Sequence, residues 1–132
     1  MYKAEFDNHI RNKTISNSFI LYGESEFLID MYASMLSNYA DANFLIFYND
    51  EYNFNSAKAH LSQASLFGDR NVLVIKTEKK VTKKELEALF GLCDKNSENI
   101  FIYAYLGSDY KLYNNKKTFE KFRVMSVRFF HP

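Results

Sequence analysis

The turn after the first apolar run of the chain lies where a phosphate could bind, because ligands favour the carboxyl ends of strands and helix N-termini attract anions. Residues 18–22 read as a buried strand, Gly23 follows, and a helical apolar pattern starts a few residues later. A phosphate-binding loop places a second glycine, a lysine and a serine or threonine five, six and seven residues after its first glycine. Those places hold Leu28, Ile29 and Asp30. The turn therefore lacks the close backbone approach, the ammonium group and the hydroxyl that bind phosphate and magnesium.

The charges in this turn also oppose an anion. Glu24, Glu26 and Asp30 would repel a phosphate, whereas the dipole of a following helix favours acidic residues at its start. Ser25 has the side chain of an N-cap. We therefore expect a structural turn here and no nucleotide. The alternative hypothesis is that the residues around Gly23–Glu26 form the site of an enzyme or a nucleotide switch. A binding experiment tests it.

A second candidate is the segment 63–70, Gln-Ala-Ser-Leu-Phe-Gly-Asp-Arg, just before a strand-like run. Leu66 and Phe67 are adjacent large apolar residues beside a Gly-Asp turn signal. On spacing alone, packing back onto the sheet is the commoner arrangement for such a pair. The alternative is that the pair enters a pocket of a partner protein. Burial of both would contribute about 1.5–3 kcal/mol each, against roughly 8 kcal/mol for a micromolar complex, so the pair would anchor an interface without making all of it.

Lysines gather in two places and suggest contacts with nucleic acid. The first group is Lys76, Lys79, Lys80, Lys83 and Lys84, and the second is Lys111, Lys116, Lys117 and Lys121. The first group is not interleaved with aromatic residues or arginine in the manner of a base-stacking surface, and we interpret the second group in the same way. The formal net charge of +1 leaves no long-range attraction for a polyanion. A solvated charged surface is the simpler interpretation of both groups.

The remaining reactive residues form no catalytic or metal-binding pattern. Cys93 is the single cysteine and falls on the apolar side of a predicted helix, and His60 is isolated. The three histidines are too scattered for a metal motif. Asp50, Glu51 and Asp109 are the acids near predicted strand ends, too few for a nuclease site. We expect a reduced chain that needs no cofactor and no metal, with no catalytic residues.

Strand-like and helical segments alternate along the chain. Apolar runs predict strands over residues 18–22, 43–48, 72–75, 100–106 and 124–130, and helical spacing predicts helices over 2–11, 27–39, 57–64, 82–93 and 116–122. Thr82 followed by Glu85 matches a capping box. This alternation predicts an α/β fold in three layers, with a mostly parallel five-stranded sheet covered by helices on both faces.

Length and composition fit one domain over residues 1–132. The chain has 132 residues, of which 47% are hydrophobic and 17% aromatic, so we expect a single core rich in phenylalanine and tyrosine. The longest apolar run, residues 100–106, is far shorter than the roughly 20 residues that span a bilayer. The start of the chain does not have the pattern of a secretory signal, and a cytoplasmic location is expected.

Two segments together resemble a known family. Leu21-Tyr22-Gly23-Glu24-Ser25-Glu26-Phe27-Leu28-Ile29, and Ala64-Ser65-Leu66-Phe67-Gly68-Asp69-Arg70 running into Val72-Leu73-Val74-Ile75, are similar to the N-terminal domain of the bacterial DNA polymerase III delta subunit, part of the clamp loader. The resemblance covers almost the whole chain, although only these two segments are specific. It implies a P-loop NTPase-like fold, that of domain I of AAA+ clamp loaders, without a working phosphate loop.

The resemblance also implies a function and partners. In the family, an adjacent Leu-Phe pair enters a hydrophobic pocket of the sliding clamp (the beta subunit) and helps open it for loading on DNA during replication. Leu66 and Phe67 match that pair, and Gln63 and Ser65 complete a clamp-binding pentapeptide whose second place, often leucine, is Ala64 here. The family's subunit is non-catalytic and longer. It joins the other clamp-loader subunits through domains that this chain lacks, and its contact with DNA is weak or indirect.

Overall fold

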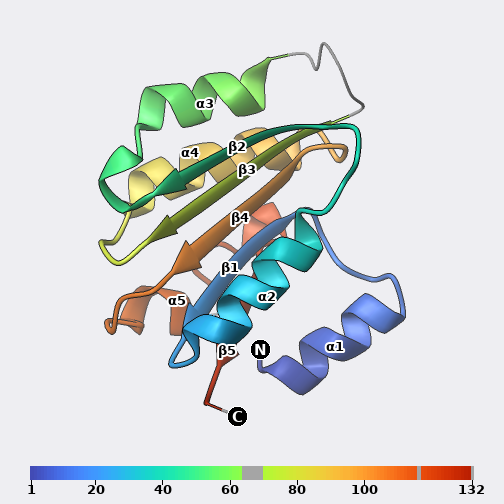
Figure 1. Ribbon diagram of the computed structural model, residues 1–132, viewed down its shortest axis with the longest axis vertical. Coiled ribbons are helices and arrows are strands. Elements are labelled where there is room, and N and C mark those ends of the chain that lie inside the picture. Colours follow the sequence, from blue (N-terminus) through green and yellow to red (C-terminus); the bar gives the residue numbers. More distant parts are fainter. Residues whose placement is uncertain (64–69, 116, 132) are drawn as a thin grey trace.

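A computed structural model describes residues 1–63, 70–115 and 117–131, and its centre is a five-stranded sheet. All neighbouring strands are parallel, in the order β2-β3-β4-β1-β5. The strands are β1 (Ser18–Gly23), β2 (Ala42–Tyr48), β3 (Arg70–Thr77), β4 (Ile100–Tyr105) and β5 (Met125–Phe129). The expected sheet is confirmed, and it is wholly parallel (Figure 1).

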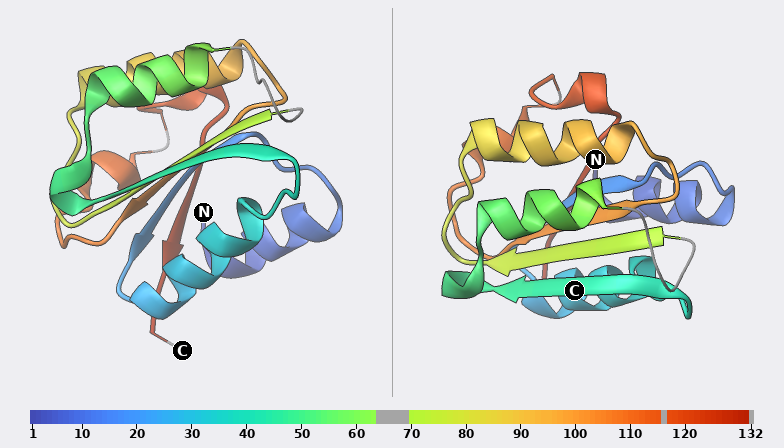
Figure 2. Two further views of the ribbon diagram at one scale, coloured as in Figure 1. Left: turned by 45° about the horizontal axis from the view of Figure 1, so that its top comes forward. Right: turned by 90° about the horizontal axis from the view of Figure 1, so that it is seen from above.

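Helices cover both faces of this sheet and give the three layers that the sequence predicts (Figure 2). One face carries α1 (Lys3–Arg11) and α2 (Glu26–Leu36). The other carries α3 (Phe54–Ser62), α4 (Lys83–Asp94), α5 (Lys111–Asn114) and the short 3-10 helix η2 (Glu120–Phe122), while a further 3-10 turn, η1 (Asn49–Glu51), follows β2. No helix in the described ranges is long and apolar enough to cross a membrane.

Aromatic side chains fill the space between the layers. On the α3–α4 face, Phe90 packs against Phe101 with ring centroids 5.0 Å apart, and Tyr103 packs against Tyr113 at 5.7 Å. On the α1–α2 face, the buried rings include Phe6, Phe19 and Phe129. Such aromatic pairs stabilise a fold by more than the area they bury contributes. They help to hold a helical layer on each face of the sheet.

The helix starts follow the caps that the sequence predicts. Ser25 Oγ accepts a hydrogen bond from Leu28 N at 3.2 Å and begins α2. Thr82 Oγ accepts from Glu85 N at 3.3 Å and begins α4. The second half of that capping box is absent from the described contacts, because the Glu85 carboxylate accepts from Tyr52 Oη at 2.7 Å and so links α4 to the η1–α3 connection.

One predicted helix is wrong. The segment 116–122 was expected to be helical, yet its described part contains only a turn and the 3-10 helix η2, while α5 lies earlier. The Asn115 side chain accepts from Lys117 N at 3.0 Å, a local turn that competes with helix formation. Arg123 then adopts a left-handed conformation with φ of 59° and ends η2.

Candidate functional site

The predicted clamp-binding residues fall at the connection between α3 and β3. Helix α3 ends at Ser62 and strand β3 begins at Arg70. Ser65, Leu66 and Phe67 lie outside the described residues. Gln63 is the C-cap of α3, in an extended conformation and exposed, so the chain leaves the helix at the surface.

A different place, the crevice between the carboxyl ends of β1 and β4, is where a nucleotide would bind in an open α/β sheet. After β1 the chain passes to α2 on one face, and after β4 it passes to α5 on the other. Since β1 and β4 are neighbours, their connections diverge there, which is the topological position at which ligands bind in such sheets.

The turn after β1 is short and is held by the end of β5. It consists of Glu24 and Ser25, since β1 ends at Gly23 and α2 begins at Glu26. Glu24 N donates to Phe129 O at 2.8 Å, and Gly23 has φ of 124°. A Cβ atom at Gly23 would lie 2.2 Å from Phe129 O. Gly23 therefore allows β5 to approach the end of β1 closely. Glu24 in the turn and Glu26 at the start of α2 are both exposed.

Tyrosines fill the layer beneath the crevice. The Tyr22 ring lies 5.4 Å from that of Tyr110 and 5.7 Å from that of Tyr113, and Tyr22 Oη donates to Asn114 Oδ1 at 2.7 Å. Tyr103 and Tyr113 share a hydrogen bond of 2.9 Å between their hydroxyls. Burial raises the pKa of Tyr22, Tyr103 and Tyr113, so these phenols stay neutral and act in packing.

A cavity of about 620 Å³ opens beside these rings, between the start of α1 and α5. Its lining contains one carboxylate, Glu5, and no lysine, arginine or histidine side chain among the described residues; it consists of Met1, Tyr2, Ala4, Glu5, Tyr22, Tyr113, Asn114, Val124 and Ser126. Such a lining offers phosphate no cationic side chain.

Most lysines from the end of β3 to the start of α4 form ion pairs with acidic residues. Lys79 Nζ lies 3.3 Å from Asp50 Oδ1. Three further ion pairs involve this group: Lys76 with Asp30, Lys80 with Asp109, and Lys83 with Glu87. The hydrogen bond from Lys80 lowers the pKa of the Asp109 carboxyl. Carboxylates therefore lie beside most lysines of the first group. Asp50 and Asp109, two of the acids near predicted strand ends, are among these carboxylates.

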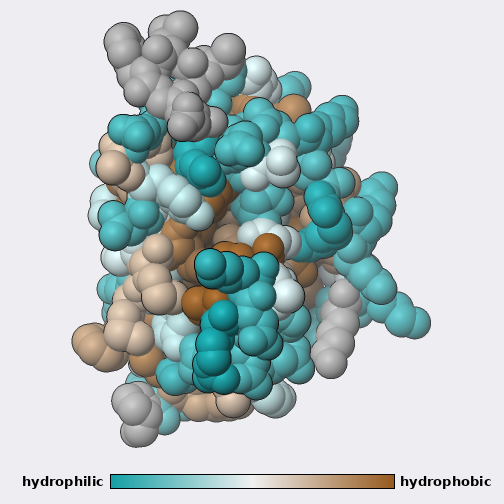
Figure 3. Space-filling view, turned by 90° about the vertical axis from the view of Figure 1, so that its right-hand side faces the viewer, coloured by the Kyte–Doolittle hydropathy of each residue, from teal (hydrophilic) through white to brown (hydrophobic). Residues whose placement is uncertain are grey.

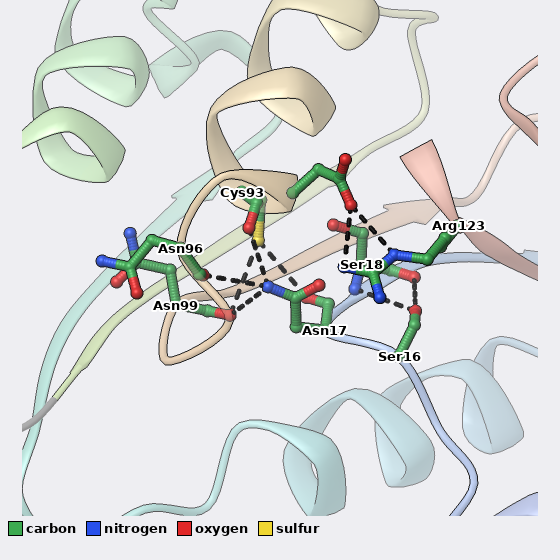
Figure 4. A network of polar contacts seen from close by, with 8 residues as sticks. Ser16, Asn17, Ser18, Cys93, Asn96, Asn99 and Arg123 are labelled. Atoms are coloured by element: carbon green, nitrogen blue, oxygen red, sulfur yellow. Dashed lines mark hydrogen bonds and ion pairs between the residues drawn. The ribbon is translucent and has the colours of Figure 1, made fainter. Parts of the chain in front are cut away.

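At the other end of the sheet, where the strands begin, a network of asparagine side chains was not foreseen. Asn17 Nδ2 donates to Cys93 O at 2.8 Å, Asn96 O at 3.1 Å and Asn99 O at 2.9 Å, joining the start of β1 to the loop after α4 (Figure 4). Asparagine usually signals a turn or a cap, so the residue type and its spacing did not indicate this network.

His60 and Cys93 are both buried inside the fold. His60 is buried, with Nε2 at 2.9 Å from Asn43 O and 3.0 Å from Val72 O. Because both neighbours of Nε2 are carbonyl oxygens, which only accept hydrogen bonds, Nε2 is the nitrogen that carries the proton. Cys93 is fully buried, as expected for a core residue, and burial raises the pKa of its thiol to about 11. No cluster of potential metal ligands occurs within the described ranges.

Apolar surface is exposed near this end of the molecule. A hollow of about 140 Å³ lies between α1, α2 and the starts of β1 and β4, with Ile10, Ile15, Phe19, Leu36 and Ile100 in its lining. Figure 3 views the end where the strands begin and shows hydrophobic atoms within a rim of hydrophilic residues. On α2, Phe27, Met31 and Met35 also face solvent.

Comparison with known proteins gives limited similarity. No protein-family model matches the chain. Two curated proteins of Helicobacter pylori, from strains J99 and 26695, are 27% and 26% identical to it over 142 aligned positions. The alignments cover 98% of this chain and 39% of each relative. The chain therefore spans about two fifths of the length of these relatives.

Proposed function

We propose that this chain is a non-catalytic clamp-loader domain, similar to the N-terminal domain of the DNA polymerase III delta subunit. It binds the sliding clamp through Leu66 and Phe67, supported by Gln63 and Ser65. The observation that carries the proposal is the pentapeptide-like sequence 63–67 at the connection between α3 and β3. Gln63, its one described member, is exposed at the end of α3.

The proposal includes a fold relationship to P-loop NTPases of the AAA+ class, with the phosphate loop lost. The position of β1 between β4 and β5 supports it, because the crevice at β1 is where such a sheet would hold a nucleotide. The two-residue turn, the exposed Glu24 and Glu26 beside it and the tyrosines that pack around Tyr22 support the absence of an ATPase activity.

The proposed role is to help open the clamp for loading during DNA replication in the cytoplasm. A ligand shifts an equilibrium only by its differential affinity, so the domain must bind the distorted, open clamp more tightly than the closed ring. Contacts with the other clamp-loader subunits would be made by the further domains that the longer subunits of this family have. DNA would be contacted weakly or indirectly.

The test is a calorimetric titration of the chain with the sliding clamp encoded by the same genome. We expect binding by the wild type, and its loss when Leu66→Ala and Phe67→Ala are combined, with an unchanged circular dichroism spectrum. The matched control combines Phe27→Ala and Met31→Ala, two exposed apolar residues on α2, and should bind like the wild type. Unfolding of the first double variant would show that Leu66 and Phe67 belong to the core.

The same instrument tests the alternative that this is a nucleotide-binding or nucleic-acid-binding α/β domain. Heat on addition of ATP and magnesium would favour a nucleotide site near Gly23 and Glu26. Binding to DNA that weakens when Lys76, Lys79, Lys80, Lys83 and Lys84 are replaced would favour the nucleic-acid module. Either result without clamp binding would overturn the proposal.

A further inference from the structure

Arg128, on β5, differs from the other arginines of the chain in its bonding. Each of the others reaches the side chain of a neighbour: Arg11 reaches Asn8, Arg70 reaches Glu98 and Arg123 reaches Asp94. The guanidinium of Arg128 has no hydrogen bond or ion pair within the described residues, and its Nε is buried. Because a buried donor without an acceptor is costly, the donors of Arg128 are available to a ligand.

Two aromatic rings hold this guanidinium in place. The Cζ atom of Arg128 lies 4.8 Å from the centroid of the Tyr110 ring and 5.0 Å from that of the Phe130 ring. Such contacts stabilise the cation. The N–H donors of a guanidinium lie in its plane, so an acceptor must approach in that plane, and a carboxylate can accept two of these hydrogen bonds at once. Arg128 therefore presents the donors that a planar oxyanion needs.

The cavity between the start of α1 and α5 lies next to Arg128. Ser126 lines this cavity, and Arg128 is the next residue of β5 on the same face, since side chains alternate along a strand. Tyr2 and Tyr22 also line the cavity, and both are neighbours of Arg128 in the sheet. Arg128 N donates to Met1 O at 2.9 Å, which holds the first residues of the chain along the edge of β5 (Figure 1).

The walls of the cavity suit the apolar body of a small molecule. Its volume of about 620 Å³ is within the range of small-molecule sites, and Tyr2, Tyr22 and Tyr113 are in its lining. The two rings beside the guanidinium continue this aromatic wall. The Phe130 ring lies 5.5 Å from that of Tyr2, and the Tyr110 ring lies 5.4 Å from that of Tyr22. An aromatic ring in the cavity would therefore pack against other rings.

The charges around the cavity distinguish between anions. Glu5 is in the lining and is exposed, so its carboxylate opposes the entry of a second strongly negative group. A phosphate monoester carries nearly two negative charges at neutral pH, whereas a carboxylate carries one. The single charge of the Arg128 guanidinium matches a carboxylate. The ligand that fits these charges is a monoanion.

We infer that Arg128 and this cavity form a binding site for a small aromatic carboxylic acid. The carboxylate of the ligand accepts hydrogen bonds from the guanidinium, and its ring lies among the tyrosines of the cavity. The inference does not rest on the proposed function, because no residue of this site belongs to the segment 63–67.

The experiment uses three probes that share a phenyl ring. Phenylacetate carries the carboxylate, phenylacetamide is its neutral analogue, and phenyl phosphate carries the larger charge. Each probe is titrated into the isotope-labelled chain up to about 20 mM, and NMR signals of Arg128 Nε–H and of the Ser126 and Tyr22 amides are followed. We expect phenylacetate to shift these signals and to bind at least about tenfold more tightly than either of the other probes.

Two substitutions at Arg128 test the role of the guanidinium. Arg128→Gln should weaken phenylacetate binding at least about tenfold, and Arg128→Lys, which keeps the charge without the planar donors, should weaken it less. The matched control is Arg11→Gln, at an exposed position of α1, which should bind within about twofold of the wild type. The NMR spectrum of each variant shows whether it is folded. If Arg128→Gln does not fold, the comparison of probes on the wild type decides.

Four results would overturn the inference. Phenylacetate that binds no better than phenylacetamide, or that does not bind at all, would show that no carboxylate site exists. Tighter binding of phenyl phosphate would assign the site to phosphate. An equal loss in Arg11→Gln and Arg128→Gln would show that net charge, and not the guanidinium beside the cavity, attracts the probe. Signal shifts confined to other parts of the chain would place the binding elsewhere.

Discussion

Gly23 decides how closely β5 can approach the end of β1. Its φ of 124° is a conformation that side chains rarely adopt, and an added Cβ would overlap Phe129 O at 2.2 Å. We expect Gly23→Ala to reduce the free energy of unfolding by about 3 kcal/mol or more, since backbone strain and the overlap add. Urea denaturation followed by circular dichroism measures the loss.

Gly91, inside α4, is the matched control for that substitution. A Cβ there would meet Phe122 Cε1 at 3.5 Å, an ordinary contact. Because glycine in a helix interior costs stability relative to alanine, Gly91→Ala should raise the free energy of unfolding by about 0.5–1 kcal/mol. Equal effects at the two glycines would contradict the role given to the left-handed conformation of Gly23.

The Cys93 thiol should make stability depend on pH in the alkaline range. Burial raises its pKa from 9.0 to about 11, so below pH 9 both the folded and the unfolded chain hold the proton. Between pH 9 and 11 the unfolded chain releases it first, so stability falls as pH rises, by about 1 kcal/mol at pH 10. Urea midpoints at pH 8 and 10 measure this loss, and Cys93→Ala should make the slope shallower, while the part that remains belongs to the buried tyrosines, whose pKa burial also raises. A slope that Cys93→Ala leaves unchanged would assign the effect to other groups.

At the scale of elements, the start of α2 depends on one hydroxyl. Ser25 Oγ caps the helix by accepting from Leu28 N. We expect Ser25→Ala to cost about 1 kcal/mol of unfolding free energy, while Ser34→Ala, at an exposed position within α2, should be neutral or slightly stabilising. Thermal unfolding of the two variants side by side decides whether the cap or general helix propensity controls α2.

Strands and long helices could be predicted because their signals are local. The run Val72–Ile75 lies within β3, and the apolar spacing around Leu86 and Leu89 lies within α4. The segment after β4 could not be predicted in the same way. There, Tyr113 must reach the hydroxyl of Tyr103 across the core, and Asn115 forms a local turn, so tertiary contacts and turn chemistry override the weak helical pattern.

For the candidate site, the sequence supplies a motif, and the binding site itself stays a prediction. Neighbouring residues in the sequence identify the pair Leu66 and Phe67, and the failed phosphate loop is likewise a matter of spacing. The hydrogen bonds to the end of α3 come from Asn71, at the start of β3, and Asn99, just before β4, and no local pattern brings these residues together. Long-range hydrogen bonds between single asparagines leave no periodic signal in a sequence.

At the scale of the whole molecule, charge is balanced locally as well as in total. The net charge is +1, and lysines near the carboxyl ends of the strands pair with acids from other elements, as Lys79 does with Asp50. Exposed pairs of this kind contribute little to stability. Their consequence is electrostatic: carboxylates beside the lysines reduce the attraction of that end of the molecule for a polyanion.

This balance predicts how binding should respond to salt. A contact made mainly by Leu66 and Phe67 is apolar, so the dissociation constant for the clamp should change less than about twofold between 0.1 and 0.5 M NaCl. Binding that neutralised about five phosphates through Lys76, Lys79, Lys80, Lys83 and Lys84 would weaken more than about a hundredfold over that range. Titrations at three salt concentrations distinguish the two. A steep salt dependence of clamp binding would show that charged side chains, and not the apolar pair, carry the interface.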